Sequence, residues 1–441
     1  MLRGSTRHPN RGIPTMENGF LTLDALCGLK QRTLMNTHIP SGGIAAIGRC
    51  TASANVAVMI ALSSMLAVVD ASAQECPGTT VSSGLRRPMG MALSNQGNVL
   101  VSETGTATPD SGRISIVAPS GNRRTLLDGL PSGRSDVGDP AGPAGIAMRG
   151  RTLYALMSIG DSVLPSPVPT RNLANPNVSS PIFSSVLAIH FSASVEKSTE
   201  GFTLSPADQQ TLAARQTVHL SNGGGDTVDL ELVANFPDYV SDPLPGFPAI
   251  VRGSNPFGLV VVADQLYVTD GGRNLVWQVD IPTGSFSPLA SFPTIPNPLF
   301  PGIGGPVVEA VPTGIEYADG ELLVTLFRGV PFAPGTSTVM QIDPSTGLQS
   351  AFLSGLKTAI GVLTMKVRGE ESYLVLQNSS GPAPFFGGPG LVLAFDSGGG
   401  APAVLADCLG RPTAMLRVAR TGTLYVTELL TGRIVALDLG S

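Results

Sequence analysis

The chain is poor in charged residues, in histidine and in tryptophan. Of its 441 residues only 13% are Asp, Glu, Lys or Arg, four are histidine and one is tryptophan, whereas 42% are apolar. Charged residues usually make up about a quarter of a globular protein. A chain with so little charge and so much apolar side chain is expected to bury a large core, which excludes an intrinsically disordered protein.

Amphipathic helices are also scarce. Runs of five to seven residues rich in β-branched side chains dominate, and few segments repeat apolar residues at helical spacing. Glycine (53 residues) and proline (37 residues) are abundant without a collagen-like period, which is typical of a structure with many tight turns. The sequence therefore predicts an all-β fold.

The N-terminal segment has the composition of a secretory leader. The apolar run NVAVMIALSSMLAVV (55–69) follows Arg49 and precedes an A-x-A pattern that ends at Ala73. We expect a leader over residues 1–73, with Met35 as an alternative start, cleavage near Ala73, and export to the periplasm or the extracellular space. No later segment has the roughly 18 consecutive apolar residues of a membrane span, so none is expected in the mature chain.

Removal of the leader changes the charge and the cysteine content. It takes away six basic and three acidic residues, so the net charge of −5 becomes more negative. An acidic surface repels phosphate backbones, which excludes nucleic acid as a partner. Cys76 and Cys408 remain, and the repeat register puts them near opposite faces of the fold, so we expect them to stay unpaired. No Cys/His cluster has the spacing of a zinc site.

One pattern begins six times along the chain, and it consists of two apolar runs joined by a short turn. Its first residues are Pro88, Pro143, Pro256, Pro312, Ala359 and Pro412. Periods near 50 residues with several short strands indicate a propeller. We predict one domain over 76–441, a six-bladed β-propeller with four-stranded blades and with insertions at 162–182 and 195–226. Seven blades are the alternative, because the interval from 143 to 256 is about twice as long as the others.

The last unit has three strands of its own. The first strand of the mature chain is therefore expected to join the last blade and close the ring, which removes the open sheet edges. Within the second insertion, the segment SPADQQTLAARQ (205–216) has the pattern of a short helix.

Polar residues with oxygen ligands end several of the second strands. A ring of such oxygens suits calcium or another hard cation, and it would resemble the site of metal-dependent lactonases and esterases built on six-bladed propellers. The alternative is that each acid pairs with an arginine of its own hairpin (Arg113, Arg273 or Arg433), and the repetition of acid plus arginine favours this structural interpretation. The candidate ligands are Glu103, Asp270, Asn378 and Glu428.

Other candidates for chemistry are few. Two histidines, His190 and His219, remain after leader removal, but no nucleophile motif accompanies them, and we predict structural roles for both. Glu316 is the only acid within a first strand. It either lines the channel as a base or points into channel water as a solvated group, and we favour the second.

Three loops rich in aromatic residues, proline and glycine lie on the same face by the repeat register. They are FPTIPNPLFPGIGGP (292–306), FRGVPFAPG (327–335) and GPAPFFGGPG (381–390). Their aromatic side chains either form an apolar patch for a small molecule or protein at the channel mouth, or fold inward and plug it. The candidate binding residues are Phe300, Phe327, Phe332, Phe385 and Phe386, together with Glu316.

From about residue 84 onward the chain resembles the bacterial ScyD/ScyE family, most specifically in VPFAPG and SNPFGL. The family takes its name from proteins encoded with the biosynthesis of scytonemin, a cyanobacterial pigment. The resemblance implies an exported, NHL-like propeller and carries no catalytic residues.

Three functions are compatible with these observations. We expect a non-catalytic, exported binding or scaffold protein without a cofactor, because histidine and nucleophile motifs are lacking. A calcium-dependent hydrolase or lactonase that uses the ring of acids is the alternative. A quinone-cofactor dehydrogenase ranks last, because no basic or histidine-bearing site is evident.

Overall fold

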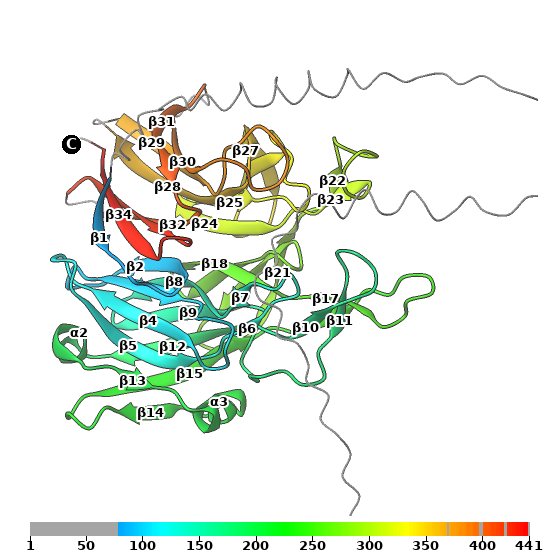
Figure 1. The fold of residues 1–441 in the computed structure, drawn as a ribbon. Helices are drawn as coiled ribbons and strands as arrows, with labels where there is room; N and C mark the ends of the chain where they lie inside the picture. The colour runs from blue at the N-terminus through cyan, green and yellow to red at the C-terminus, as the bar shows by residue number, and fades with distance from the viewer. Residues whose placement is uncertain (1–77, 368–369, 397–399, 419–420, 440–441) are drawn as a thin grey trace, which may run out of the picture. The chain divides into compact units, whose positions relative to one another are not determined.

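A computed structural model describes all residues except 1–77, 368–369, 397–399, 419–420 and 440–441. The expected leader, its cleavage site and Cys76 lie outside the described residues. Strands dominate, and the helices that the structure describes are α2 (Ala193–Ser198) and α3 (Pro206–Ala213), so the predicted all-β class is confirmed (Figure 1). No helix in the described part of the chain is long and apolar enough to cross a membrane.

Each of the six repeats begins with a strand at one edge of a larger antiparallel sheet. We call these sheets the first to the sixth, in chain order. Their first strands are β2 (Pro88–Leu93), β8 (Pro143–Arg149), β18 (Pro256–Val262), β24 (Pro312–Ala318), β28 (Ala359–Val367) and β32 (Pro412–Val418).

The remaining strands of each sheet follow in order. The first sheet continues with β3 (Val99–Glu103), β4 (Gly112–Val117) and β5 (Arg123–Leu130), and the second with β9 (Thr152–Met157), β12 (Ser185–Phe191), β15 (Thr227–Asn235) and β14 (Val218–Ser221). The third has β19 (Gln265–Asp270), β20 (Leu275–Asp280) and β21 (Phe286–Ser291), and the fourth has β25 (Glu321–Leu326), β26 (Ser337–Ile342) and β27 (Gln349–Leu356). The fifth has β29 (Glu370–Gln377), β30 (Gly390–Phe395) and β31 (Ala403–Leu409), and the sixth has β33 (Thr423–Glu428) and β34 (Arg433–Asp438).

The sixth sheet gains its fourth strand from the other end of the described chain. Strand β1 (Gly78–Ser82) pairs antiparallel with β34, with Gly78 opposite Leu437. The predicted pairing between the N-terminal segment and the last unit is therefore observed (Figure 1).

Glycines in the first strands let neighbouring sheets approach closely. A Cβ on Gly90 would lie 2.6 Å from the carbonyl oxygen of Ala144, and one on Gly258 would lie 2.2 Å from that of Thr313. Both distances are too short for any side chain, so the glycine near the start of the repeat is required by the packing of one sheet on the next.

The core is divided among the interfaces between sheets. The largest apolar cluster joins the first and second sheets, with Leu100 and Leu127 on one side and Leu153 and Leu187 on the other. Because the strands are covered on both faces, they carry apolar residues at successive positions instead of alternating ones.

The long interval in the second repeat holds two additions. Strands β10 (Val163–Pro165), β11 (Asn172–Ala174), β16 (Tyr239–Ser241) and β17 (Ile250–Gly253) form a separate small sheet. The second addition contains α2, β13 (Phe202–Thr203), which pairs in parallel with β5, and α3. Ser205 and Asp208 form a capping box at the start of α3, so the helix expected at 205–216 is present at Pro206–Ala213.

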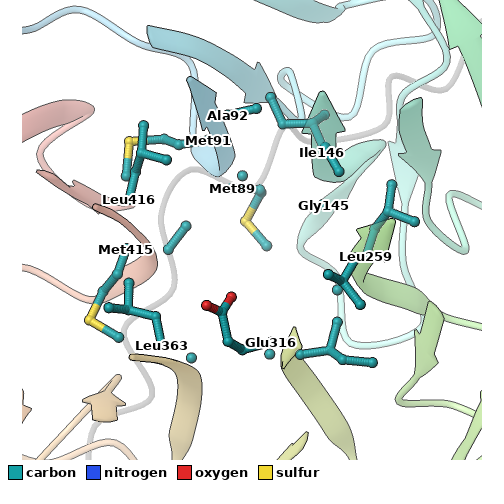
Figure 2. Close-up of a pocket in the computed structure, with 18 of the residues that line it drawn as sticks. Met89, Met91, Ala92, Gly145, Ile146, Leu259, Glu316, Leu363, Met415 and Leu416 are labelled. Atoms are coloured by element: carbon teal, nitrogen blue, oxygen red, sulfur yellow. The ribbon is translucent and has the colours of Figure 1, made fainter. Parts of the chain in front are cut away.

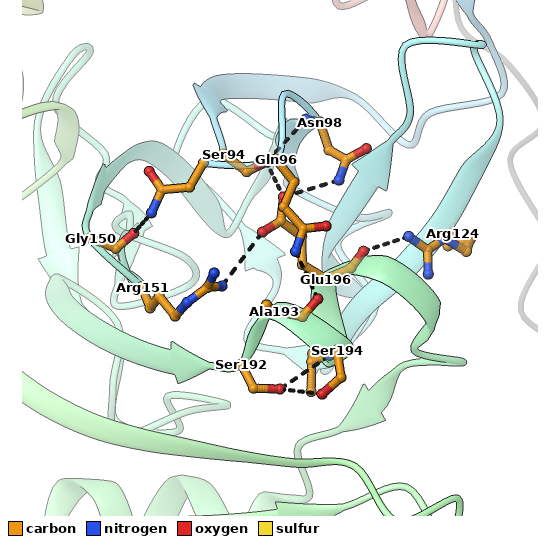
Figure 3. A network of polar contacts seen from close by, with 12 residues as sticks. Ser94, Gln96, Asn98, Arg124, Gly150, Arg151, Ser192, Ala193, Ser194 and Glu196 are labelled. Carbon is orange, nitrogen blue, oxygen red and sulfur yellow. Dashed lines mark hydrogen bonds and ion pairs between the residues drawn. The ribbon is translucent and has the colours of Figure 1, made fainter.

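A buried carboxylate anchors α2 (Figure 3). Glu196 is 1% exposed and accepts hydrogen bonds from the Ser94 hydroxyl and from Nδ2 of Asn98 at 3.0 Å. Nη1 of Arg151 lies 3.9 Å from its Oε2. Because Ser94 and Asn98 belong to the first sheet's β2–β3 turn and Arg151 to the second sheet's β8–β9 turn, this one carboxylate joins the addition to both sheets.

The prediction that Cys408 is unpaired is wrong. Cys408 on β31 is disulfide-bonded, whereas the repeat register predicts a free thiol. The other cysteines of the chain, Cys27, Cys50 and Cys76, lie outside the described residues. The register of the repeats places Cys408 near the end of its strand, but it places no residue before β1, so it could not exclude a disulfide partner there.

Candidate functional site

The first strands of all six sheets line one cavity, which we call the channel cavity. Its volume is about 390 Å³. Figure 2 shows that its wall is built mainly from apolar side chains, among them Met89, Met91, Leu363, Met415 and Leu416. Among the described residues, Glu316 and Arg417 are the ionisable groups that line it.

Glu316 lies on β24, opposite Leu323 of β25, and its carboxylate points into the channel cavity (Figure 2). The side chain is half-buried. Removal from water raises the pKa of this carboxyl from 4.5 to about 7, against the opposing effects of the Arg417 charge and of a hydrogen bond from the Thr364 backbone N–H. The structure thus places Glu316 on the wall of the channel cavity in a half-buried position.

Arg417, which the sequence analysis missed, lies on β32 and lines the same cavity. Its Nη1 donates to the carbonyl oxygen of Thr364 at 2.5 Å. Arg417 was hard to detect from the sequence, because it does not occupy the repeat position that matches Glu316. It stands five residues after Pro412, whereas Glu316 stands four residues after Pro312.

The acids predicted as metal ligands make hydrogen bonds and ion pairs within the protein. Glu103 is fully buried, and Arg113 donates to it from Nε at 2.9 Å and from Nη2 at 2.7 Å. Arg433 donates to Glu428 from Nε, so the hairpin ion pair is present in both sheets. Asp270 differs, since it accepts from the Asn255 backbone N–H at 2.7 Å and from Nε1 of Trp277 at 3.0 Å, while the Arg273 guanidinium lies over the Trp277 ring.

Asn378 does not occupy the position that matches these acids. Glu103 pairs in register with Pro88, Asp270 with Pro256 and Glu428 with Pro412, but the residue opposite Ala359 is Gln377. Gln377 accepts a hydrogen bond from the Lys357 backbone N–H at 2.7 Å, as Glu103 does from Arg86. Asn378 instead donates to the Pro412 carbonyl and accepts from Arg411.

These contacts are structural. The side chains of Glu103, Asp270, Gln377 and Glu428 each accept a hydrogen bond from a backbone N–H of the loop that leads into the first strand of the same sheet, and so fix that loop. No group of three or more His, Cys, Asp or Glu in the described part of the chain is arranged to hold a metal ion.

The two histidines lie away from the channel cavity. Nδ1 of His190 lies 2.9 Å from the Thr152 hydroxyl, and Nδ1 of His219 lies 2.7 Å from Asp229 at an exposed site. Neither lines a cavity.

Three of the five candidate phenylalanines form a cluster. The rings of Phe332 and Phe386 stack with centroids 4.3 Å apart, Phe327 contacts both, and the Arg411 guanidinium lies over Phe386 at 4.2 Å. Phe300 and Phe385 make no ring contact with these three among the described residues, and about half of each is exposed. Ring contacts therefore join three of the five residues, Phe327, Phe332 and Phe386.

A second cavity, which we call the vestibule, lies among the loops that lead into the first strands. Its volume is about 430 Å³, and Met89 and Phe257 line it as well as the channel cavity. Arg171, Arg252, Arg328 and Phe332 also line it. The vestibule therefore adjoins the channel cavity at Met89 and Phe257.

No protein-family model and no curated protein matches the chain. It is similar in structure to a putative oxidoreductase (glucose dehydrogenase) from Thermus thermophilus, with 16% identity over 82% of this chain and 99% of that one and a TM-score of 0.42. It is also similar to the PQQ-bound form of an aldose sugar dehydrogenase from Streptomyces coelicolor, with 17% identity over 82% of this chain and 96% of that one and a TM-score of 0.41.

These comparisons correct two expectations. The expected function was a non-catalytic binding or scaffold protein, with a calcium-dependent hydrolase as the alternative, whereas both similar structures are described as sugar dehydrogenases. Against the expectation of no cofactor, with calcium as the remaining possibility, the Streptomyces structure is described as a PQQ-bound form.

Proposed function

We propose that the chain is an enzyme that transfers a proton in the channel cavity, with Glu316 as the general acid or base. The observation that carries this proposal is a single carboxyl, Glu316, on the wall of a mainly apolar cavity of about 390 Å³, whose other ionisable lining residue among those described is Arg417. A carboxyl with a pKa of about 7 is present in both protonation states at neutral pH, so it can take up a proton and return it.

The cavity also defines the class of substrate. Apolar walls and a volume near the lower end of the usual range for ligand pockets suit a compact, largely apolar molecule with one acidic C–H or O–H group. A hydrogen bond from the Thr364 backbone N–H helps to orient the Glu316 carboxyl in the cavity. Exclusion of water from the carboxylate strengthens it as a base.

The test uses a probe whose ring opens when a base removes one proton, nitrobenzisoxazole. We expect purified protein to accelerate this elimination, and Glu316→Gln to reduce the rate by about 100-fold, the usual contribution of a general base. Glu321→Gln is the matched control, since Glu321 lines neither cavity. Equal rates for wild type and Glu316→Gln would contradict the proposal.

A second proposal concerns how the six sheets are arranged around the channel cavity. We infer a closed six-bladed propeller in which the channel cavity is the central channel. In its support, the first strands contact one another in the order β2, β8, β18, β24, β28, β32 and back to β2. Apolar clusters join every neighbouring pair of sheets, including the sixth and the first.

We also propose export of the mature chain. The disulfide of Cys408 supports it, because disulfides persist in oxidising compartments. N-terminal sequencing of protein recovered outside the cytoplasm is expected to begin at Gln74. Mass spectrometry of non-reduced peptides is expected to join Cys408 to Cys76, the one other cysteine that cleavage at this position retains. A first residue upstream of Ala73 would contradict the predicted cleavage.

A further inference from the structure

We propose that the vestibule binds a small carboxylic acid with an apolar body, and that Arg328 binds its carboxylate. This site is separate from Glu316, and its argument does not depend on proton transfer in the channel cavity. It rests on the burial and the unsatisfied hydrogen-bonding capacity of one guanidinium.

Arg328 is buried without an acidic partner. Only 6% of the residue is exposed, yet it lines the vestibule. Its Nε donates to the Thr336 carbonyl at 3.0 Å, and its Nη1 has no hydrogen-bond partner among the described residues. No ion pair to Arg328 exists in the described part of the chain, and burial lowers its pKa.

The backbone holds this side chain in place. Arg328 has a φ of 71°, a conformation that costs free energy for a residue other than glycine. The N–H groups of Arg328 and Gly329 donate to the carbonyls of Ala310 and Glu309, each at 3.0 Å. An uncompensated buried charge is also unfavourable. The buried guanidinium without an acidic partner is explained if an anion binds it.

The other charges of the vestibule limit the anion to a single carboxylate. Arg171 lies 3.2 Å from Asp242 and Arg252 lies 2.8 Å from Glu309, while Asp139 pairs with Arg87. Asp136 adds a further negative charge to the lining. One guanidinium without an acidic partner suits one carboxylate, because the two carboxylate oxygens match the planar donors of the guanidinium. A phosphate dianion would be repelled by the acidic side chains that line the same cavity.

The walls of the vestibule define the rest of the ligand. Ile159, Val311, Val330 and Phe332 supply apolar surface in the same cavity. A volume of about 430 Å³ accommodates a small organic acid. The ligand class is therefore a monocarboxylate with an aromatic or aliphatic body.

Calorimetric titration with benzoate, benzamide and phenyl phosphate tests this inference. We expect benzoate to bind at least about tenfold more tightly than benzamide, which has its shape but no charge, and more tightly than phenyl phosphate. Arg328→Met is expected to bring benzoate down to the affinity of benzamide. Arg149→Met, which removes the same charge from an exposed arginine that lines neither cavity, is expected to keep benzoate binding within about threefold.

Three results would overturn the inference: equal binding of benzoate and benzamide, unchanged binding in Arg328→Met, or tighter binding of phenyl phosphate. Without ligand, Arg328→Met is expected to keep or raise the Tm, because it removes an unpaired buried charge, and a large fall would assign Arg328 to structure instead. Should that variant not fold, Arg328→Lys is expected to weaken benzoate binding by losing the planar pair of donors. Glu316→Gln is expected to leave benzoate binding unchanged, so failure of this site and failure of the proton-transfer proposal are distinguishable.

Discussion

Glu316 and Arg417 line the same cavity from different sheets without forming an ion pair, and the peptide groups of Thr364 hold both of them. The Thr364 N–H donates to the Glu316 carboxyl, and the Thr364 carbonyl accepts from the Arg417 guanidinium. Strand β28 thus contacts both an acidic side chain from β24 and a basic one from β32. The arginine therefore acts on the acid through its charge.

Removal of that charge is expected to raise the pKa of Glu316 above its value of about 7 in the wild type. In Arg417→Met the nearby positive charge that favours the carboxylate is lost, while the apolar walls remain. Carbon-13 NMR of the Glu316 carboxyl as a function of pH measures the change. Arg149→Met, which removes an exposed arginine of the second sheet, is the control, and an equal titration curve in Arg417→Met and wild type would contradict this prediction.

Glu316 also makes folding stability depend on pH. Because its folded-state pKa of about 7 lies above the ordinary 4.5, the folded state binds more protons between these values, and stability falls as pH rises through this window. Glu316→Gln is expected to remove this fall and to be more stable than wild type at pH 8 by roughly 2–3 kcal/mol. Urea denaturation at pH 5 and pH 8 measures it, and parallel pH profiles for both proteins would contradict it.

The repeats could be predicted from sequence because local chemistry specifies them. Pro88, Pro256 and Pro312 begin first strands as expected, and the glycines two residues after them are required where neighbouring sheets touch. The exact partner at the end of each second strand was not predictable. A one-residue difference in register separates Gln377 from Asn378, and both are polar side chains next to one another in the sequence.

The contact between the sixth and first sheets contributes to stability. Thr413 is 3% exposed, and its hydroxyl lies 2.8 Å from the Pro88 carbonyl oxygen, across 325 residues of sequence. Thr413→Val is expected to lower the free energy of unfolding by about 1–2 kcal/mol, since the carbonyl loses a buried donor. The exposed Thr421→Val is expected to change it by less than about 0.5 kcal/mol. Chemical denaturation compares them, and equal values would show that this contact does not contribute to stability.

The site itself was only partly visible in the sequence. Glu316 stood out because first strands otherwise lack acids, but its burial depends on residues from five other sheets. Arg328 gave no signal, because an arginine in a loop is ordinarily solvated. Its lack of an acidic partner is a property of the folded vestibule, where the other arginines take the nearby carboxylates.

Glu196 is expected to be the most sensitive residue of the added segment. Glu196→Ala leaves Asn98 and Ser94 without their buried acceptor, and the expected loss of stability is about 2–3 kcal/mol. The neighbouring exposed Glu200→Ala is expected to have little effect. Thermal unfolding distinguishes the two variants, and similar Tm values would contradict an anchoring role for Glu196.

The central claim is that the Glu316 carboxyl acts as a base in an apolar cavity. The pH dependence of nitrobenzisoxazole elimination tests it most directly. The rate is expected to rise with pH to a plateau, with a midpoint close to the Glu316 pKa of about 7, and this rise is expected to be absent in Glu316→Gln. A midpoint near 4.5, or the same rise in wild type and Glu316→Gln, would contradict the claim.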